Sequence, residues 1–244
     1  MCFSANMSLG LGVVGLAASG VTFLDKNETF WVRSARAYAI FHFSLMELIQ
    51  FFAYPVADQC GYGTNLFLSE LSTYHIALQA FAIMPALATY SSDPTALKRA
   101  TILGGSLSAS YLICSFLPTT WQLFTDHTTF IGNIVACMRM GKYHIAYNIA
   151  SSFGEWVMYG SLFALAVSGY LWKNNKKIAT YHFVMAIFTL YFPQWFFGVT
   201  TGEAGAIYCF YSIPITASFM PQFKKFFTAQ DYDYQDDNPV EENA

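Results

Sequence analysis

Charged residues are scarce in this sequence. Asp, Glu, Lys and Arg make up only 11% of its 244 residues, whereas 55% are hydrophobic and 18% are aromatic. The surface of a water-soluble domain needs more charge than this, so the composition excludes an ordinary soluble fold. We expect a lipid bilayer to surround most of the chain, and we expect no nucleic acid among its partners.

The apolar segments lack the alternating ten-residue pattern of membrane barrel strands. Helices are then the structure that satisfies every backbone amide and carbonyl group in lipid. Each segment is close to the roughly 20 residues that a spanning helix needs, and the segments cover residues 8–24, 37–56, 65–90, 100–117, 152–172, 178–198 and 204–222. We therefore predict an all-α fold, with a seven-transmembrane-helix bundle at residues 1–226 and a disordered, acidic C-terminal tail at residues 227–244.

Lysine and arginine are absent from the centres of these segments, and they are divided unevenly between the connections. Only Arg139 and Lys142 lie on one side of the predicted bundle. The other ten, on the opposite side, are Lys26, Arg33, Arg36, Lys98, Arg99, Lys173, Lys176, Lys177, Lys224 and Lys225. Because positively charged connections stay in the cytoplasm, this bias predicts an N-terminus that is outside or lumenal and a cytosolic C-terminus. The first segment lacks the basic start of a signal peptide, so we interpret it as a membrane helix.

Missing motifs exclude several classes of seven-helix protein. Residues 204–222 contain no lysine, so the last predicted helix cannot form a Schiff base with retinal. The acidic-Arg-Tyr and Asn-Pro-x-x-Tyr motifs of G-protein-coupled receptors are absent, as are the paired i, i+4 histidines of membrane ceramidase-like hydrolases. No inverted repeat relates the two halves of the chain, which disfavours the type of secondary transporter that is built from such repeats.

A few polar side chains lie near the centres of two predicted helices, and they share helix faces. Glu47, Gln50 and Tyr54 are spaced i, i+3 and i+7, and His75 and Gln79 are spaced i and i+4 in the next segment. Because these two helices run antiparallel, we expect Glu47 and His75 at similar depth, where they could pair, share a proton or bind a metal. Such groups are expensive in lipid, which makes them candidates for function, although polar side chains also join membrane helices by hydrogen bonds alone.

Further candidates lie at the outer ends of the predicted helices. Cys2, His144 and Glu203 could line the mouth of a cavity that descends towards Glu47 and His75. If the initiator methionine is removed, Cys2 would offer both an amine and a thiol, which is a useful pair for binding a metal or attacking a substrate. The outer side therefore holds most of the groups with chemical potential.

Two other features of the sequence predict tertiary contacts. Cys60 and Cys137 both lie on the predicted outer side, where an oxidising compartment would permit a disulfide between them; free or metal-binding thiols are the alternatives. Pro85 predicts a kink in the third helix, and Gly104 lies in a run of small residues that predicts close helix packing. His42 lies about 140° around its helix from Glu47, so we leave it out of the site.

Five short stretches resemble a family of uncharacterised multi-pass membrane proteins whose chains begin Met-Cys-Phe-Ser. The stretches are Met1–Ala5, Met46–Gln50, His75–Gln79, His144–Asn148 and Gly202–Glu203 with the residues that follow it. The resemblance implies that Cys2, Glu47, His75 and His144 recur in the family. It implies no activity.

These observations predict an integral membrane protein with a buried His/Glu/Gln site that opens outward. The leading hypothesis is a membrane-embedded metal-binding protein or enzyme, with a transition metal as the possible cofactor and an unknown small molecule or ion as the partner. The candidate catalytic residues are Glu47, His75, Gln50 and Gln79, and the candidate metal ligands are His75, His144, Glu47 and Cys2. A proton- or cation-coupled transporter or channel and a non-catalytic accessory subunit of a membrane complex are the alternatives.

Overall fold

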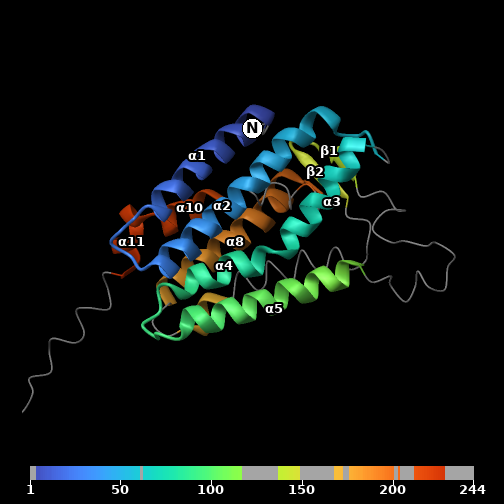
Figure 1. Ribbon diagram of the computed structural model, residues 1–244. Helices are drawn as coiled ribbons and strands as arrows, with labels where there is room; N and C mark the ends of the chain where they lie inside the picture. Colours follow the sequence, from blue (N-terminus) through green and yellow to red (C-terminus); the bar gives the residue numbers. More distant parts are fainter. Residues whose placement is uncertain are drawn as a thin grey trace, which may run out of the picture.

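The computed structural model describes residues 4–60, 63–116, 137–148, 168–172, 176–200, 203 and 212–228. Helices dominate this part of the chain, as predicted, and the long ones lie side by side (Figure 1). The elements are α1 (Ala5–Phe23), α2 (Phe30–Ala53), η1 (Tyr54–Val56), α3 (Gly63–Ala77), α4 (Gln79–Ala88), α5 (Ala96–Phe116), β1 (Cys137–Met140), β2 (Ile145–Asn148), η2 (Gly169–Leu171), α8 (Lys176–Phe197), α10 (Ser212–Phe219) and α11 (Pro221–Thr228).

Three helical segments are long and apolar enough to cross a membrane: Ala5–Phe23, Phe30–Val56 and Gly63–Ala88. They coincide with the first three predicted segments. Helices α5 and α8 coincide with the predicted segments at 100–117 and 178–198, and α10 covers part of the one at 204–222. Most of the segment at 152–172 lies outside the described residues, as does the predicted tail beyond Thr228.

The prediction of an all-α fold is wrong in one place. Strands β1 and β2 form an antiparallel hairpin in which Cys137 pairs with Asn148 and Met140 pairs with Ile145. Met138 and Ile145 are completely buried, whereas Arg139 and Met140 are exposed. Each strand has only four residues, which is too short for its alternation to stand out from the surrounding loop sequence.

Helices α1 and α2 pack closely because α1 presents small side chains to α2. Its buried face holds Ser8, Gly12, Gly15, Ser19 and Thr22, spaced by three or four residues. A Cβ atom on Gly12 would lie 2.6 Å from Leu48 Cδ2, and one on Gly15 would overlap the Ser44 side chain. Small residues that let two backbones approach are typical of helix pairs in membranes.

The third membrane-length segment is interrupted at Leu78, where α3 ends and α4 begins. The break falls well before Pro85, which lies inside helix α4, so this interruption of the helix is separate from the kink that the sequence predicts at the proline. The neighbouring helix α5 satisfies one backbone amide near the break, because the Phe81 amide donates to Ser108 Oγ at 3.1 Å. The predicted close packing of Gly104 is confirmed, since a Cβ atom there would lie 2.7 Å from the Ala80 carbonyl oxygen.

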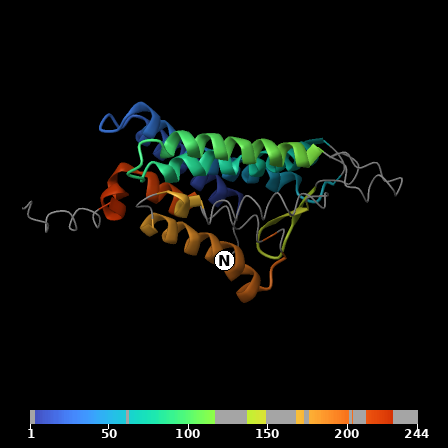
Figure 2. The ribbon, with the colours of Figure 1, turned by 90° about the horizontal axis from the view of Figure 1, so that it is seen from below.

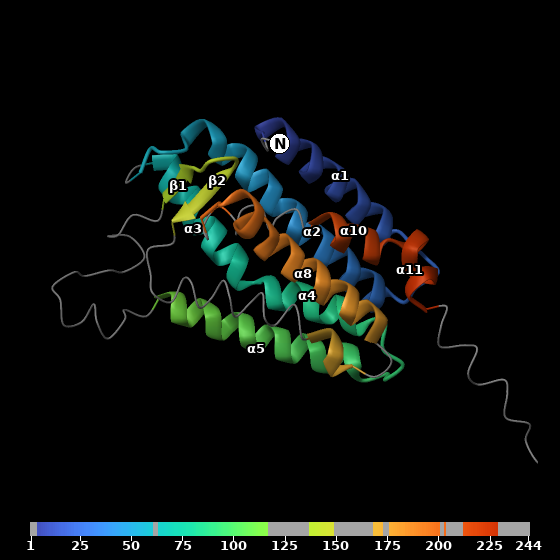
Figure 3. The same cartoon turned by 180° about the vertical axis from the view of Figure 1, so that it is seen from behind.

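The two ends of the bundle differ. The hairpin lies at one end, and α11 lies at the other end with the α1–α2 and α4–α5 connections (Figures 1 and 3). The view from below also shows the hairpin and α11 at opposite ends (Figure 2). The basic residues of the α1–α2 connection and of the starts of α2, α5 and α8, together with those of α11, thus lie far from Arg139 and Lys142 on the hairpin.

Large apolar side chains cover much of the outer surface, and polar side chains are buried inside. Val14 is 65% exposed, Leu24 71% and Trp195 86%. In contrast, Gln50 and His182 are completely buried. This distribution is the reverse of that in a water-soluble protein, in which extended apolar surface is rare and buried polar groups are few.

Candidate functional site: a buried carboxylate near the hairpin

Glu47, Gln50 and Tyr54 form a stripe along one face of α2 and η1, and this stripe forms one side of a buried polar site. Glu47 is 2% exposed and Gln50 is completely buried. Both point towards elements that are distant in the sequence, namely α1, β2 and α10, as their hydrogen bonds show. We call the group formed by Glu47, Gln50, Ser8, Tyr147 and Ser212 the Glu47 cluster.

The Glu47 carboxylate accepts hydrogen bonds from two serine hydroxyls. Ser212 Oγ on α10 lies 3.4 Å from Glu47 Oε1, and Ser8 on α1 is a second hydroxyl partner. The ion pairs of the described residues are Arg36–Glu28 and Arg99–Asp93, so none of them neutralises Glu47. A carboxylate is therefore held among hydroxyl groups inside a membrane-length helical segment, closer to its hairpin end.

Gln50 connects this carboxylate to the hairpin. Its Oε1 atom lies 3.5 Å from Ser8 Oγ, so Gln50 and Glu47 share the single hydroxyl proton of Ser8, and its Nε2 atom donates to Tyr147 Oη at 3.1 Å. The Tyr147 hydroxyl in turn donates to Met46 Sδ at 3.7 Å. Polar contacts thus run from Glu47 through Ser8 and Gln50 to β2.

The last residue of the stripe contacts the hairpin directly. Tyr54 Oη lies 2.6 Å from His144 Nδ1, and the two rings are stacked with centroids 5.7 Å apart. Burial lowers the pKa of His144 to about 4, so its imidazole is neutral at neutral pH and Nδ1 can accept the tyrosine proton. His144 therefore contacts the predicted Glu47 stripe, but it does so through Tyr54.

A carboxylate from a distant part of the chain orients the hairpin turn. Glu203 is 1% exposed and accepts from the backbone amides of Lys142 at 3.0 Å and His144 at 2.8 Å, with Tyr143 as a third donor. Gly141 leaves room for it, because a Cβ atom there would lie 2.6 Å from the Glu203 carboxyl carbon. Glu203 thus positions His144 and does not line an open cavity mouth.

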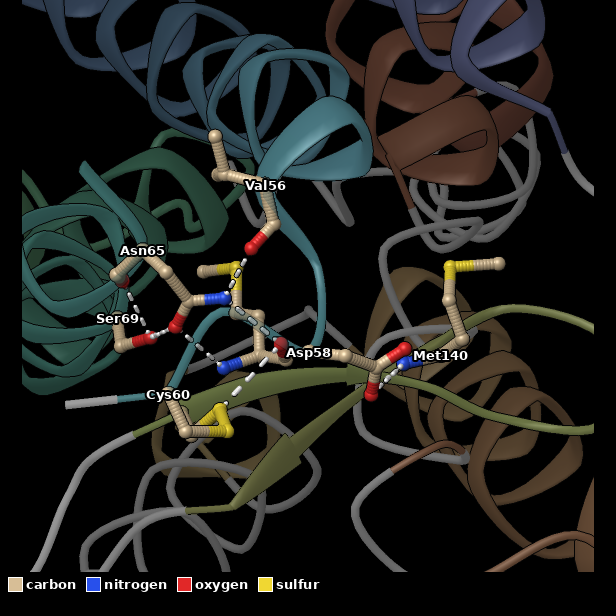
Figure 4. Close-up of a disulfide and its surroundings, with 8 residues drawn as sticks. Val56, Asp58, Cys60, Asn65, Ser69 and Met140 are labelled. Atoms are coloured by element: carbon tan, nitrogen blue, oxygen red, sulfur yellow. Dashed lines mark hydrogen bonds between the residues drawn. A yellow bond between two sulfur atoms is a disulfide. The ribbon is translucent and has the colours of Figure 1, made fainter. Parts of the chain in front are cut away.

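Strand β1 of the hairpin is attached to the α2–α3 connection and to the start of α3 (Figure 4). A disulfide joins Cys60 and Cys137, as the sequence suggested. The Asn65 side-chain amide donates to the carbonyl oxygens of Val56 at 2.7 Å and Met138 at 2.8 Å, and its Oδ1 atom accepts from the Met138 amide at 3.2 Å. These contacts hold β1, which pairs with β2, the strand that contains Tyr147.

His75 does not join the Glu47 cluster. Its ring stacks on that of His42, with centroids 3.7 Å apart and the planes within 9°. The ring of His42 also hydrogen-bonds to the backbone of His75, close to the break at Leu78. Within the described ranges the Nε2 atoms of both histidines are buried without a hydrogen-bond partner. The expectation that His75 pairs with Glu47 is therefore not met, and His42, which we had set aside, is its partner.

The described residues contain no group of three or more His, Cys, Asp or Glu side chains that could hold a metal ion. Glu47, His75 and His144 accordingly do not meet at a common point. Gln79 is buried at the start of α4, beyond the break from His75. Cys2, the remaining predicted ligand, lies outside the described residues.

Three members of the Glu47 cluster were not predicted as site residues. Ser8 and Ser212 look like ordinary small residues of apolar segments, and Tyr147 lies in what the sequence indicated as an external loop. One signal was available for Ser8, because it begins the series of small residues that α1 presents to α2. Nothing local distinguishes Ser212 or Tyr147, since their role comes from contacts across 165 and 97 residues respectively.

Fold and site together define a predominantly helical protein with three membrane-length helices and a buried polar cluster. The chain belongs to a family of unknown function, DUF5765, whose model matches residues 6–228. The match spans every element from α1 to α11 and includes the Glu47 cluster, but it begins after Met1–Ala5. No curated protein and no solved structure matches the chain.

Proposed function

We propose that the chain is a multi-pass integral membrane protein in which seven helices cross the bilayer. The N-terminus is outside or lumenal and the C-terminus is cytosolic. The exposed apolar side chains on α1 and α8 support the membrane location. The basic residues gathered at the α11 end support the orientation, and so does the disulfide at the hairpin end, because disulfides persist in oxidising compartments.

We propose further that the Glu47 cluster binds and releases a proton or a small cation, as in a proton- or cation-coupled transporter or channel. The observation that carries this proposal is the burial of Glu47 among hydroxyl partners, with no cationic side chain paired to it in the described part of the chain. A bare carboxylate in such surroundings is very costly. Glu47 therefore takes up a proton or a cation, and it can exchange that charge when the site opens.

The contacts around Glu47 offer a route towards the hairpin end. Ser8, Gln50 and Tyr147 form a series of hydrogen bonds that begins at the carboxylate. The stripe continues to Tyr54 and His144, and seven residues of helix correspond to about 10 Å along α2. The hydroxyl groups of Ser8 and Tyr147 and the imidazole of His144 can both donate and accept, which suits the passage of a proton. Gln50 orients these groups and does not itself relay a proton, because its amide oxygen only accepts and its amide nitrogen only donates.

The metal-binding and enzyme hypotheses have less support. Without a cluster of three ligands among the described residues, a metal site would need Cys2 or other residues outside those ranges. The accessory-subunit hypothesis requires only that the Glu47 cluster join α1, α2, α10 and the hairpin. Transport and packing therefore make different predictions for the same substitution.

The test is ion flux through purified protein in liposomes that contain a pH-sensitive dye. Gradients of H⁺, Na⁺ and K⁺ are applied in turn to the wild type and to Glu47→Gln, which keeps the size of the side chain and removes its charge. We expect flux in the wild type under at least one gradient and none in Glu47→Gln. Infrared difference spectra should show a carboxyl band that responds to the same ion and is missing from the variant.

Glu70→Gln is the matched control, because Glu70 is a partly exposed carboxylate on α3 outside the Glu47 cluster. It should conduct like the wild type. The proposal fails if wild-type liposomes show no more flux than empty ones under every gradient. A Glu47→Gln protein that loses thermal stability while flux is absent throughout would favour the accessory subunit.

A further inference from the structure

A cavity of about 600 Å³ lies between α2, α4 and α5, close to the basic end of the bundle. Helix α4 lies between the other two helices (Figure 1), so it forms the floor of the cavity. The wall is mostly apolar, and the apolar and aromatic side chains that contribute to it include Trp31, Tyr38, Phe81, Pro85, Leu97 and Ile102. Trp31 is 71% exposed and Ile102 is 60% exposed, so the cavity is an open groove that faces the surroundings of the bundle.

The groove is short enough to lie within one leaflet of a bilayer. Its α2 wall runs from Trp31 to Tyr38, which is about 10 Å of helix, and its α5 wall runs from Leu97 to Ile102, which is about 8 Å. Half of a typical hydrocarbon core is about 15 Å thick. An extended acyl chain that enters from the basic end would therefore lie along most of the groove.

Lys98 is the cationic residue among those that line the groove. It is exposed, and it forms no ion pair within the described residues. The adjacent Arg99 is paired with Asp93 at 3.4 Å, and the same carboxylate accepts from the Thr95 amide and hydroxyl, each at 2.8 Å. The neighbouring negative charge is thus already engaged, and the Lys98 ammonium is available to an anion.

We propose that this groove binds an anionic glycerophospholipid, with one acyl chain along the groove and the phosphate on Lys98. Basic pockets between membrane helices favour anionic head groups, and Trp31 is the type of residue that settles at the boundary between head groups and hydrocarbon. The inference rests on the proposed membrane location. It does not depend on the ion chemistry of Glu47.

The test uses a protein in which Trp31 is retained and the other four of the five tryptophans are replaced by phenylalanine. It is reconstituted in phosphatidylcholine vesicles, and brominated phosphatidylglycerol or brominated phosphatidylcholine is added to quench Trp31 fluorescence. We expect phosphatidylglycerol to bind about fivefold more tightly, which corresponds to about 1 kcal/mol for one cation near the surface. Lys98→Glu should remove this preference. Ala35→Phe, which fills the groove, should reduce it.

Lys26→Glu is the matched control, because it makes the same change of charge on an exposed residue of the α1–α2 connection that does not line the groove. It should keep the preference. Equal quenching by the two lipids in the parent protein would overturn the proposal. So would an equal loss of preference in Lys98→Glu and Lys26→Glu, since that would indicate general surface attraction.

Lys98→Gln repeats the test if Lys98→Glu does not fold. Glu47→Gln should leave the lipid preference intact, so this proposal and the proposed transport can fail separately.

Discussion

Arg36 shows how one side chain can join several elements at the basic end. Its side chain is 3% exposed, and its guanidinium lies 3.3 Å from Glu28, donates to Thr89 Oγ1 at 2.8 Å and lies over the Tyr90 ring at 4.5 Å. It therefore connects the α1–α2 connection, α2 and the end of α4. The cytosolic position predicted for Arg36 gives no information about these contacts, because counting Lys and Arg on each side of the membrane treats all the basic residues alike.

We expect Arg36→Ala to lower the free energy of unfolding by about 3 kcal/mol, because it removes the cation from a buried ion pair. Arg99→Ala is the control. Arg99 also forms an ion pair, but its side chain is 68% exposed, and exposed pairs contribute less than about 1 kcal/mol. Thermal unfolding in detergent measures both. Equal losses in the two variants would show that the burial of Arg36 has no energetic consequence.

His144 makes stability depend on pH. Burial lowers its pKa from 6.5 to about 4 in the folded protein, so between these values the unfolded chain binds more protons at this site than the folded chain does. Stability therefore rises with pH through this window, and acidification from about pH 6.5 to 4 costs about 3 kcal/mol at this site. Unfolding temperatures recorded across that range should fall more steeply in the wild type than in His144→Gln. Parallel curves would contradict the assignment.

At the scale of elements, the small face of α1 determines how closely it approaches α2. Gly15→Ala should destabilise the helix pair by about 1–3 kcal/mol, because the new methyl group would overlap the Ser44 side chain. Gly10→Ala is the matched control in the same helix. Nothing lies within 4 Å of a Cβ atom at Gly10, so this change should be neutral or stabilising by up to about 1 kcal/mol. Thermal unfolding of the two variants distinguishes steric overlap from a general effect of removing glycine.

The positions of most long helices could be predicted, whereas the break at Leu78 and the hairpin could not. Apolar length and periodicity are local properties, and they located α1, α2, α5 and α8. Neither proline nor glycine lies at or beside Leu78. The break is instead supported by partners from other helices, Ser108 and His42. The hairpin is likewise held by distant groups, namely Cys60, Asn65 and Glu203. Local sequence contains no record of such partners.

For the whole molecule, the orientation can be tested by labelling single cysteines with a maleimide that cannot cross membranes. Cysteine is introduced at Lys142 on the hairpin side or at Ser92 in the α4–α5 connection, in a background that keeps only the Cys60–Cys137 disulfide. In sealed membrane vesicles whose cytosolic face is outward, Ser92→Cys should react directly, and Lys142→Cys should react only after permeabilisation, because the basic end faces the cytosol. The opposite pattern would invert the proposed topology, and labelling of both without permeabilisation would place both ends in the cytosol.

The linear chain was sufficient to determine the membrane-length helices, the separation of its basic residues and the shared face of Glu47, Gln50 and Tyr54. These properties depend on composition and on a helical period of 3.6 residues, which can be read without knowing any partner. Only packing decided what each polar group contacts. Glu47 meets serines from α1 and α10, and His75 meets His42, because the break at Leu78 and the docking of the hairpin arise from contacts between residues that are far apart in sequence.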